Sequence, residues 1–193
     1  YLEGTAAGMM TKTNKVGFVA GLVGPAIIKV AEGYKLGVQA VNPNCDVYTA
    51  YTGSTEDVQK SKEAAQAMID KGVDLIGGGG NASNAGMIKA CEEAGVYAFG
   101  ELEQQNLAPE TVIFCNMNNI ENLVLQAVKD TIDGDFQGCI REYGIAADVA
   151  QLTEYNSHVP QEVKDKLAEC MDQMRSGELD IPMITEISDD IIH

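Results

Sequence analysis

The stretch that decides the fold is DLIGGGGNASNAG, residues 74–86, where an apolar run meets four consecutive glycines before Asn81 and a helical pattern. Glycine loses more conformational freedom on folding than any other residue and weakens regular elements. Such a run either makes a tight turn from strand to helix or lets the backbone approach a ligand beside the free N–H groups of a helix. Four glycines in succession at a strand's carboxyl end favour the second interpretation.

Strands and helices alternate outward from this stretch in both directions. Apolar and β-branched runs predict strands at residues 15–22, 45–53, 73–80, 96–101 and 111–117. Helical spacing predicts helices at residues 25–41, 54–72, 81–95, 119–134 and 161–179. Short links between alternating strands and helices predict an α/β fold, a Rossmann-like parallel sheet with helices on both faces.

Cap residues set the expected helix ends. Ser54 with Asp57 resembles a capping box, and Asn81 is a candidate cap of the helix that follows the glycines. Gly72 and Gly95 are natural stops for the two helices that precede them. These signals predict compact helices that begin and end close to the ends of the neighbouring strands.

The regular pattern is weaker at both ends of the chain. After residue 134 the remaining strand candidates are residues 138–145, 149–155 and 180–186. Residues 1–10 have the pattern of a helix already under way, which indicates a cut edge rather than a natural start. In the helix expected at residues 25–41, an apolar face is predicted from Ile27, Val30, Tyr34 and Val38.

The charge of the chain argues against several classes of partner. The 193 residues carry a formal net charge of -16, with 29 acidic and 13 basic residues. Phosphate binding needs Lys and Arg, so this balance speaks against nucleic acid and against adhesion to an anionic membrane through protein charge. Hydrophobic residues make up 45% of the chain, which is normal for a globular protein with a real core.

Cysteine and histidine usage argues against metal sites and disulfides. The five cysteines are an odd number, lie far apart and form no CxxC pair, so neither a disulfide framework nor a zinc site is expected. His158 and His193 are the two histidines, which excludes a His-rich metal site. Free thiols indicate a reducing setting, either a cytoplasm or the exterior of an anaerobe. No signal peptide and no apolar run long enough to span a membrane occurs in these residues.

The residues that follow the predicted strands indicate where a ligand binds. In sheets of this kind, ligands bind outside the carboxyl ends of the strands, at the topological switch point. This edge is rich in Gly, Asn, Glu and Gln and has no Lys, Arg, His or Asp before the helices begin, since it carries Gly21, Gly24, Tyr51, Gly53, Ser54, residues 77–81, Glu101, Glu103, Gln104, Asn116, Asn118 and Asn119. Neutral hydrogen-bonding groups with a carboxylate suit a polar organic molecule.

A nucleotide-binding loop fits the glycine stretch poorly. The phosphate-loop pattern GxxxxGK[ST] is absent. A dinucleotide fingerprint at Gly78, Gly80 and Ser83 has Ser where Gly or Ala belongs, and it follows the third strand instead of the first. Glu101 does lie about twenty residues further on, where a ribose-binding acid is expected. An enzyme with a nucleotide cofactor therefore ranks below a binding protein.

Candidate catalytic groups are few. Glu101 and Glu103 are a pair of carboxylates, but alternate residues of a strand point to opposite faces, so they cooperate only if the strand has ended. Cys115 follows an apolar run with neither histidine near it in the sequence, which favours a buried core thiol over a nucleophile. We expect no catalytic residues, no cofactor and no metal.

Several motifs, taken in order, resemble the basic membrane lipoprotein family. Residues 11–43, TKTNKVGFVAGLVGPAIIKVAEGYKLGVQAVNP, are similar to its segment that reads roughly TKTGKVGFVGG, then P, FxxGYxxG and NP. YTGSTEDVQKSKEAAQAMIDKGVDLI resembles its Y-x-G-S-x-x-D and GxDxI segments, and the glycine stretch resembles its Gly-rich turn. FGELEQQNLAP is similar to its G-V-D-x-D-Q segment, and SGELDIPMIT to its closing S-G-K-I-x-V-P. The resemblance runs from Tyr1 to about Pro182, and it is loose over residues 138–160.

The resemblance implies an extracytoplasmic substrate-binding protein of an ABC transporter. The best-known member type is a purine nucleoside receptor, a lipid-anchored protein whose two lobes close on a nucleoside. By this resemblance the first lobe is absent. Residues 1–14 are its tail, residues 15–147 form the second lobe, a type I periplasmic-binding-protein-like lobe, and residues 148–193 return towards the first lobe. The exposed surface of a lone lobe favours self-association.

The resemblance also implies ligand-binding residues. The family's base-stacking aromatic falls at Val30, its ribose-binding acid at Glu101 and its ribose-binding Lys at Asn118. Its Gly-rich turn, which lets the backbone approach the sugar, falls at residues 79–81, which are Gly79, Gly80 and Asn81. Val and Asn at the first and third positions depart from the family's pattern and leave purine specificity open.

Three functions are compatible with these observations. The first is a solute-binding protein that passes a nucleoside or similar polar solute to an ABC permease. The second is a ligand-sensing regulatory domain of the same fold, since some relatives are transcriptional activators. The third, an enzyme with a nucleotide cofactor, ranks last. A lipobox upstream favours the first function, and an attached DNA-binding or signalling segment favours the second.

Overall fold

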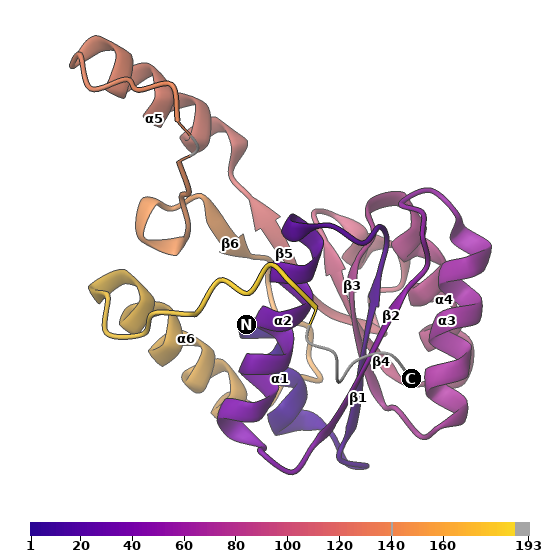
Figure 1. The fold of residues 1–193 in the computed structure, drawn as a ribbon. Helices are drawn as coiled ribbons and strands as arrows, with labels where there is room; N and C mark the ends of the chain where they lie inside the picture. Colours follow the sequence, from indigo (N-terminus) through magenta and orange to yellow (C-terminus); the bar gives the residue numbers. More distant parts are fainter. Residues whose placement is uncertain (140, 188–193) are drawn as a thin grey trace.

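The computed structural model describes residues 1–139 and 141–187 and contains a six-stranded sheet in the order β2-β1-β3-β4-β5-β6 (Figure 1). The strands are β1 (Lys15–Ala20), β2 (Asp46–Tyr51), β3 (Leu75–Gly79), β4 (Tyr97–Glu101), β5 (Val112–Asn118) and β6 (Ala150–Leu152). The α-helices are α1 (Leu2–Met10), α2 (Pro25–Val41), α3 (Val58–Asp70), α4 (Asn84–Ala94), α5 (Ile120–Ile132) and α6 (Gln161–Ser176). The predicted α/β fold is confirmed.

The sheet is mixed, which corrects the expectation of parallel strands throughout. Strands β1 to β5 pair in parallel, as predicted, whereas β6 runs antiparallel to β5. Asn118 at the end of β5 pairs with Ala150 at the start of β6. The chain therefore leaves the sheet at one point of this edge and returns to the same point after residues 119–149.

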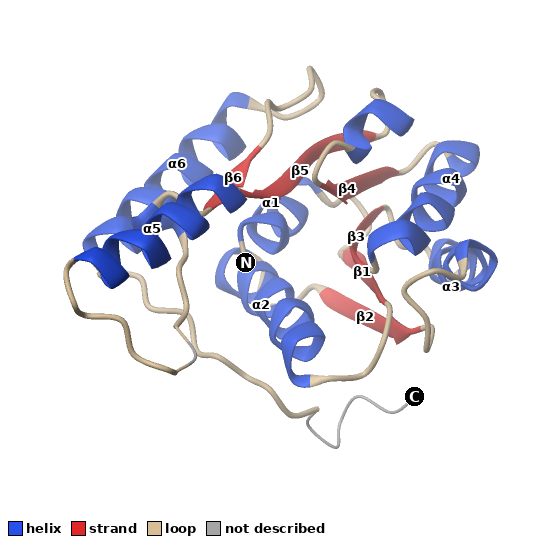
Figure 2. Cartoon of the chain, turned by 90° about the horizontal axis from the view of Figure 1, so that it is seen from above, coloured by secondary structure: helices blue, strands red, loops and turns tan. Residues whose placement is uncertain are grey.

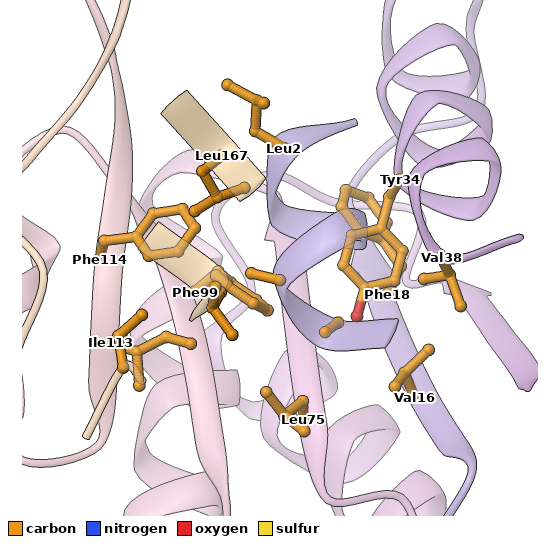
Figure 3. Close-up of a cluster of buried hydrophobic side chains, with 14 of the residues drawn as sticks. Leu2, Val16, Phe18, Tyr34, Val38, Leu75, Phe99, Ile113, Phe114 and Leu167 are labelled. Carbon is orange, nitrogen blue, oxygen red and sulfur yellow. The ribbon is translucent and has the colours of Figure 1, made fainter. Parts of the chain in front are cut away.

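Helices cover both faces of the sheet (Figure 2). One face packs against α1, α2 and α6, and the other packs against α3 and α4. The first face is the more aromatic: Phe18, Tyr34, Phe99 and Phe114 are fully buried there beside Leu167 of α6 (Figure 3). Their rings meet in tilted and edge-on pairs 5.0–6.3 Å apart between centroids. Burial of large apolar side chains of this kind is the main stabilising contribution to a domain.

The α5 helix differs from the others because it packs on neither face. It projects away from the sheet (Figure 1), and none of its residues is buried. Its apolar residues are exposed instead, including Val124 at 55%, Val128 at 48% and Ile132 at 78%. An apolar stripe on a helix normally faces a core, so this one has no counterpart among the described residues.

Two predicted helix starts are wrong by a few residues. The α3 helix begins at Val58, with Asp57 as its N-cap accepting a hydrogen bond from the Lys60 N–H at 3.0 Å. Ser54 lies in the preceding turn, where its hydroxyl accepts from the backbone N–H groups of Glu56 and Asp57. Ser54 therefore makes its bonds one turn before the helix, and Asp57 caps the helix itself.

Asn81 does not cap a helix. It opens the short 3-10 helix Asn81–Ser83 in a left-handed conformation with φ 50°, and the caps of this turn and of α4 make no side-chain cap bond. Gly95 does end α4, with φ 69°, and Gly72 follows the end of α3 with φ 92°. Both glycine stops are confirmed, because the left-handed region favours glycine at these positions.

The weak predictions at the chain ends have mixed outcomes. The first helix is confirmed as α1, and residues 149–155 contain β6. Residues 180–186 form no strand, and neither do the described residues of 138–145, so these two predictions are wrong. Residues 188–193, which include His193 and the end of the predicted return segment, lie outside the described residues. None of the described helices is both long and apolar enough to cross a membrane.

Candidate functional site

A cavity of about 380 Å³ lies at the carboxyl end of the sheet, between the α1–α2 layer, strands β4 to β6 and helix α6. This volume falls within the range of small-molecule sites. Val30, Glu101 and Asn118 all line it, although they come from α2, β4 and β5. The fold thus brings together three residues for which the sequence predicts a binding role, and the predicted edge of the sheet is where they meet.

Val30 does not belong to the core, which corrects the apolar face predicted for its helix. The buried face of α2 contains Ile28, Ala31, Tyr34 and Val38, whereas Val30 is 43% exposed. Because it stands one position before Ala31, it falls at the border of the buried stripe and its side chain reaches the cavity. An apolar side chain is therefore available on this wall to pack against a flat ligand.

Neighbouring side chains pack closely against the four glycines at residues 77–80. A Cβ atom at Gly77 or Gly79 would press on the ring of Phe18, and one at Gly78 would meet the side chains of Asn84 and Met87 at 2.7–2.8 Å. At Gly80 a Cβ would overlap the Ser83 hydroxyl. Close contacts with neighbouring side chains therefore favour glycine at these positions, whether or not a ligand also approaches them.

Gly79, Gly80 and Asn81 do not line the cavity themselves. Their connection to it runs through Glu101, whose Oε2 accepts a hydrogen bond from the Asn81 backbone N–H at 3.0 Å. The same oxygen accepts a second bond from the Asn84 side-chain amide at 2.9 Å. The turn that follows the glycines therefore holds the Glu101 carboxylate in position, although the turn itself does not line the cavity.

Gln104 completes this polar network. Its Oε1 accepts from the Glu101 backbone N–H at 3.0 Å, and its Nε2 donates to the Asn81 carbonyl at 2.9 Å. The Glu101 carboxylate is therefore held through Oε2, and Oε1 accepts no bond from any described residue. A carboxylate oxygen fixed in position and without a protein donor is suited to accept a hydrogen bond from a bound solute.

The electrostatics of the turn disfavour a phosphate. Burial raises the pKa of Glu101, and the Asn81 N–H opposes that shift by stabilising the carboxylate. The carboxylate takes the backbone donor that a phosphate would use in a dinucleotide site. A phosphate group at this position would also face the negative charge of Glu101, so the alternative of a nucleotide cofactor finds no support in this turn.

The candidate catalytic groups do not assemble. Glu103 is exposed in the turn after β4 and does not line the cavity with Glu101. Cys115 is fully buried, and desolvation raises the pKa of its thiol to about 11, as expected for an inert core cysteine. His158 pairs instead with Glu110, with Nε2 and Oε2 3.1 Å apart. Within residues 1–139 and 141–187, no three His, Cys, Asp or Glu side chains gather in a way that would hold a metal ion.

Sequence reasoning missed Glu3 as a residue of this cavity. Glu3 of α1 lines it and is buried, with its Oε1 accepting a hydrogen bond from the Asn116 side chain at 2.8 Å. The sequence does single out Asn116, because it lies at the carboxyl end of a predicted strand. The sequence gives no indication of Glu3, because its contact with Asn116 joins residues 113 positions apart.

Asn84 was missed for a related reason. It is fully buried one residue beyond the turn, and only the folded chain shows that its amide points to Glu101.

The chain matches one protein family over most of its length. Residues 1–185 match the family described as ABC transporter substrate-binding protein, PnrA-like. A CD4+ T-cell-stimulating antigen of Listeria monocytogenes is 31% identical over an alignment of 202 positions, which covers 94% of this chain and 56% of the antigen. A purine-binding protein of Brucella abortus is 26% identical over 93% of this chain and 51% of that protein. The chain spans about half the length of the curated relatives it matches.

Solved structures share the fold. A transcriptional activator of the comK gene from Bacillus halodurans superposes with a TM-score of 0.82 at 24% identity, over 93% of this chain and 62% of that chain. A solute-binding protein of an ABC transporter system from Conexibacter woesei superposes with a TM-score of 0.80 at 24% identity, over 96% of this chain and 63% of that chain. These similarities confirm the predicted periplasmic-binding-protein-like fold.

Proposed function

The chain belongs to the family of PnrA-like ABC transporter substrate-binding proteins, and from this premise we propose that it binds a nucleoside or a similar small polar solute. The observation that carries the proposal is the cavity, which gathers Val30, Glu101 and Asn118 from three separate elements. Its size and its mixture of apolar and hydrogen-bonding walls suit one small organic molecule. The family is one of solute-binding proteins and not of enzymes.

Each of the three residues has a role in this proposal. The Oε1 of Glu101, held in place through Oε2, accepts hydrogen bonds from the sugar hydroxyls. Asn118 at the end of β5 offers an amide donor and acceptor where the resemblance implies a Lys. Val30 packs against the base, with less contact area than an aromatic ring provides. A similarity to a purine-binding protein supports this ligand class.

We further propose that the ligand lies between two lobes, of which the described chain supplies one. The excursion of residues 119–149 leaves and re-enters the sheet at the pair formed by Asn118 and Ala150, and the Asn119 N–H donates to the Val149 carbonyl at 2.6 Å. Two adjacent chain crossings of this kind are suited to act as a hinge. The apolar stripe of α5 within the excursion would pack on the other lobe, which would bury side chains that are exposed in the described chain.

The same proposal includes the setting of the protein. We place the full-length protein outside the cytoplasm, attached to the cell membrane by a lipid anchor, where it delivers its solute to an ABC permease. Membership of a transporter-associated family supports the permease as a partner. The acidic composition supports attachment through a lipid and not through protein charge.

A thermal-shift screen of the full-length protein tests the ligand class. We expect adenosine, guanosine or inosine to raise the melting temperature, while free sugars and amino acids do not. Glu101→Ala should abolish the shift, and Glu103→Ala, an exposed acid two residues away, should retain it. The ligand-free melting temperature of each variant checks that it is folded. A shift with another class of solute alone would keep the binding role and refute the nucleoside.

A further inference from the structure

A second acid contributes to the cavity from the opposite layer of the fold. Glu3 lies on α1, is 8% exposed and lines the same cavity as Glu101. Its Oε1 accepts a hydrogen bond from the Asn116 side-chain amide at 2.8 Å, and that amide also donates to the Gly100 carbonyl at 3.3 Å. Oε2 of Glu3 accepts no bond from a described residue. One oxygen of Glu3 is thus fixed, and the other remains available, as in Glu101.

The surroundings of Glu3 give it little positive charge. The described residues that line the cavity include no Lys, Arg or His side chain. The other titratable groups that act on Glu3 or respond to it are Glu101 from β4, Cys115 from β5 and Tyr34 from α2. On α6, Lys166 and Cys170 act on the Tyr1 phenol. Two carboxyl groups therefore share one cavity whose described lining includes no cationic side chain.

The pKa of Glu3 is raised to about 7, mainly by burial and to a smaller extent by the negative charge of Glu101, while the Asn116 amide opposes the shift. Glu3 therefore exchanges its proton close to neutral pH. A solute that offers an N–H or O–H group favours the ionised carboxylate, because only that form presents both oxygens as acceptors. A solute that brings negative charge meets two acids and cannot be held in the same way.

We propose that Glu3 is a second ligand-binding acid of the cavity, placed by Asn116, which selects solutes that present a hydrogen-bond donor and carry no negative charge. This inference rests on the proposed function, because both use the same cavity. On binding, the Glu3 carboxyl gives its proton to solvent, and the carboxylate oxygen accepts a hydrogen bond from the solute. Binding and proton release are therefore linked.

Titration calorimetry on the full-length protein tests the inference. The probes are five nucleosides (adenosine, guanosine, inosine, cytidine and uridine) and glucosamine, each compared with its monophosphate at pH 6 and pH 8. Two buffers with different ionisation enthalpies report the protons released. The variants are Glu3→Gln and Asn116→Ala, and the control is Glu32→Gln. Glu32 is the same residue type, is also 8% exposed, lies on α2 and does not line the cavity.

The expected result has four parts. The wild type binds its best solute about tenfold more tightly at pH 8 than at pH 6 and releases up to one proton at the lower pH. The matching monophosphate binds at least about tenfold more weakly, owing to the repulsion between like charges. Glu3→Gln weakens binding and loses both the pH dependence and the proton release. Asn116→Ala moves the midpoint of the pH dependence upward, because Glu3 loses the donor that stabilises its ionised form.

The outcomes separate the two proposals. If Glu3→Gln binds a nucleoside with wild-type affinity and pH dependence, the role of Glu3 is refuted and the proposed function stands. Binding of a monophosphate as tightly as its parent refutes the selection against negative charge. If glucosamine alone binds, in a Glu3-dependent way, the inference stands and the nucleoside is wrong. If no probe binds the wild type at either pH, both proposals are refuted.

Discussion

At the scale of single residues, the site depends on groups whose positions only the folded chain fixes. Glu101 follows a predicted strand, and a family resemblance implies its role, so the sequence was sufficient to single it out. The bonds from the Asn81 N–H and the Asn84 amide that orient it were not predictable, because they depend on a left-handed turn at Asn81. Glu3 could not be identified from the sequence either, because its contact with Asn116 joins residues 113 positions apart.

The raised pKa of Glu3 predicts how stability changes with pH. Its folded-state pKa of about 7 lies above the ordinary 4.5, so the folded protein keeps a proton that the unfolded chain releases. The stabilising contribution is full below about pH 4.5 and is lost as pH rises through 7, by about 3 kcal/mol in total. The Gln side chain of the Glu3→Gln variant does not ionise in this pH range. We therefore expect the free energy of unfolding of wild type, relative to Glu3→Gln, to fall by about this amount between pH 4.5 and pH 8.

Urea unfolding at several pH values provides this measurement. The Glu32→Gln variant serves as the control, because its acid is as buried as Glu3 but lies outside the cavity. The comparison of the two variants separates the effect of Glu3 from the general effect of replacing a buried Glu by Gln. Parallel curves for wild type and Glu3→Gln over the whole range would show that Glu3 is ionised in the folded state at ordinary pH, and would contradict a raised pKa for this acid.

At the scale of elements, the sequence predicts most of the sheet and its helices. The five parallel strands are right because their apolar runs end at glycines or polar residues, and the glycine stops at Gly72 and Gly95 are right because left-handed backbone favours glycine. The antiparallel β6 was not predictable, because its direction depends on where the chain returns after residue 149. Residues 180–186 resemble a strand in composition, yet they form none in the structure.

Close helix contact gives a prediction at this scale. Gly37 of α2 faces the backbone of α1, where an added Cβ would overlap the Tyr1 carbonyl oxygen. Gly33 lies one turn earlier, and a Cβ there would meet the Tyr1 nitrogen at an ordinary 3.7 Å. We expect Gly37→Ala to lower the free energy of unfolding by about 1–3 kcal/mol through overpacking. Gly33→Ala should be neutral or stabilising by up to about 1 kcal/mol, because Ala favours a helix.

Thermal or urea unfolding of the two variants distinguishes the cause. Both replace a glycine by alanine in one helix, so their helix propensities change alike. Equal effects would mean that α1 and α2 are not packed as closely as the structure has them.

At the scale of the whole molecule, α5 is the element that the described fold does not explain. Its position and its exposed apolar stripe could not be predicted, because the sequence predicts a helix at residues 119–134 but not the surface that covers it. The division into the tail of a first lobe, a second lobe and a return segment stays a prediction. The α6 helix, within the predicted return segment, packs on α1, with Val163, Leu167 and Cys170 buried. Within the excursion, Ile145 packs against the core on the α6 side, whereas α5 has no buried residue.

The proposal that α5 packs on another lobe predicts a difference between two lengths of the protein. The double variant Val124→Glu and Val128→Glu should change the stability of the 193-residue chain by no more than about 0.5 kcal/mol, because both side chains are exposed. In the full-length protein the same charges would be buried, and we expect a loss of several kcal/mol. Lys129→Glu, on another side of α5, is the matched control and should have little effect at either length.

Light scattering on the short chain adds a second readout. The exposed stripe should cause it to self-associate, and the double variant should keep it monomeric. If the double variant is equally harmless in both lengths, α5 does not face another lobe.

The most direct test of the central claim is a crystal structure of the full-length protein with the solute that gives the largest thermal shift. We expect density for a nucleoside-like molecule between Val30, Glu101 and Asn118, with a ligand hydroxyl within hydrogen-bond distance of Oε1 of Glu101. We also expect the other lobe of the full-length protein to enclose the ligand on the open side of the cavity. A solute bound elsewhere, or a cavity that stays empty while the solute binds, would contradict the assignment of this site.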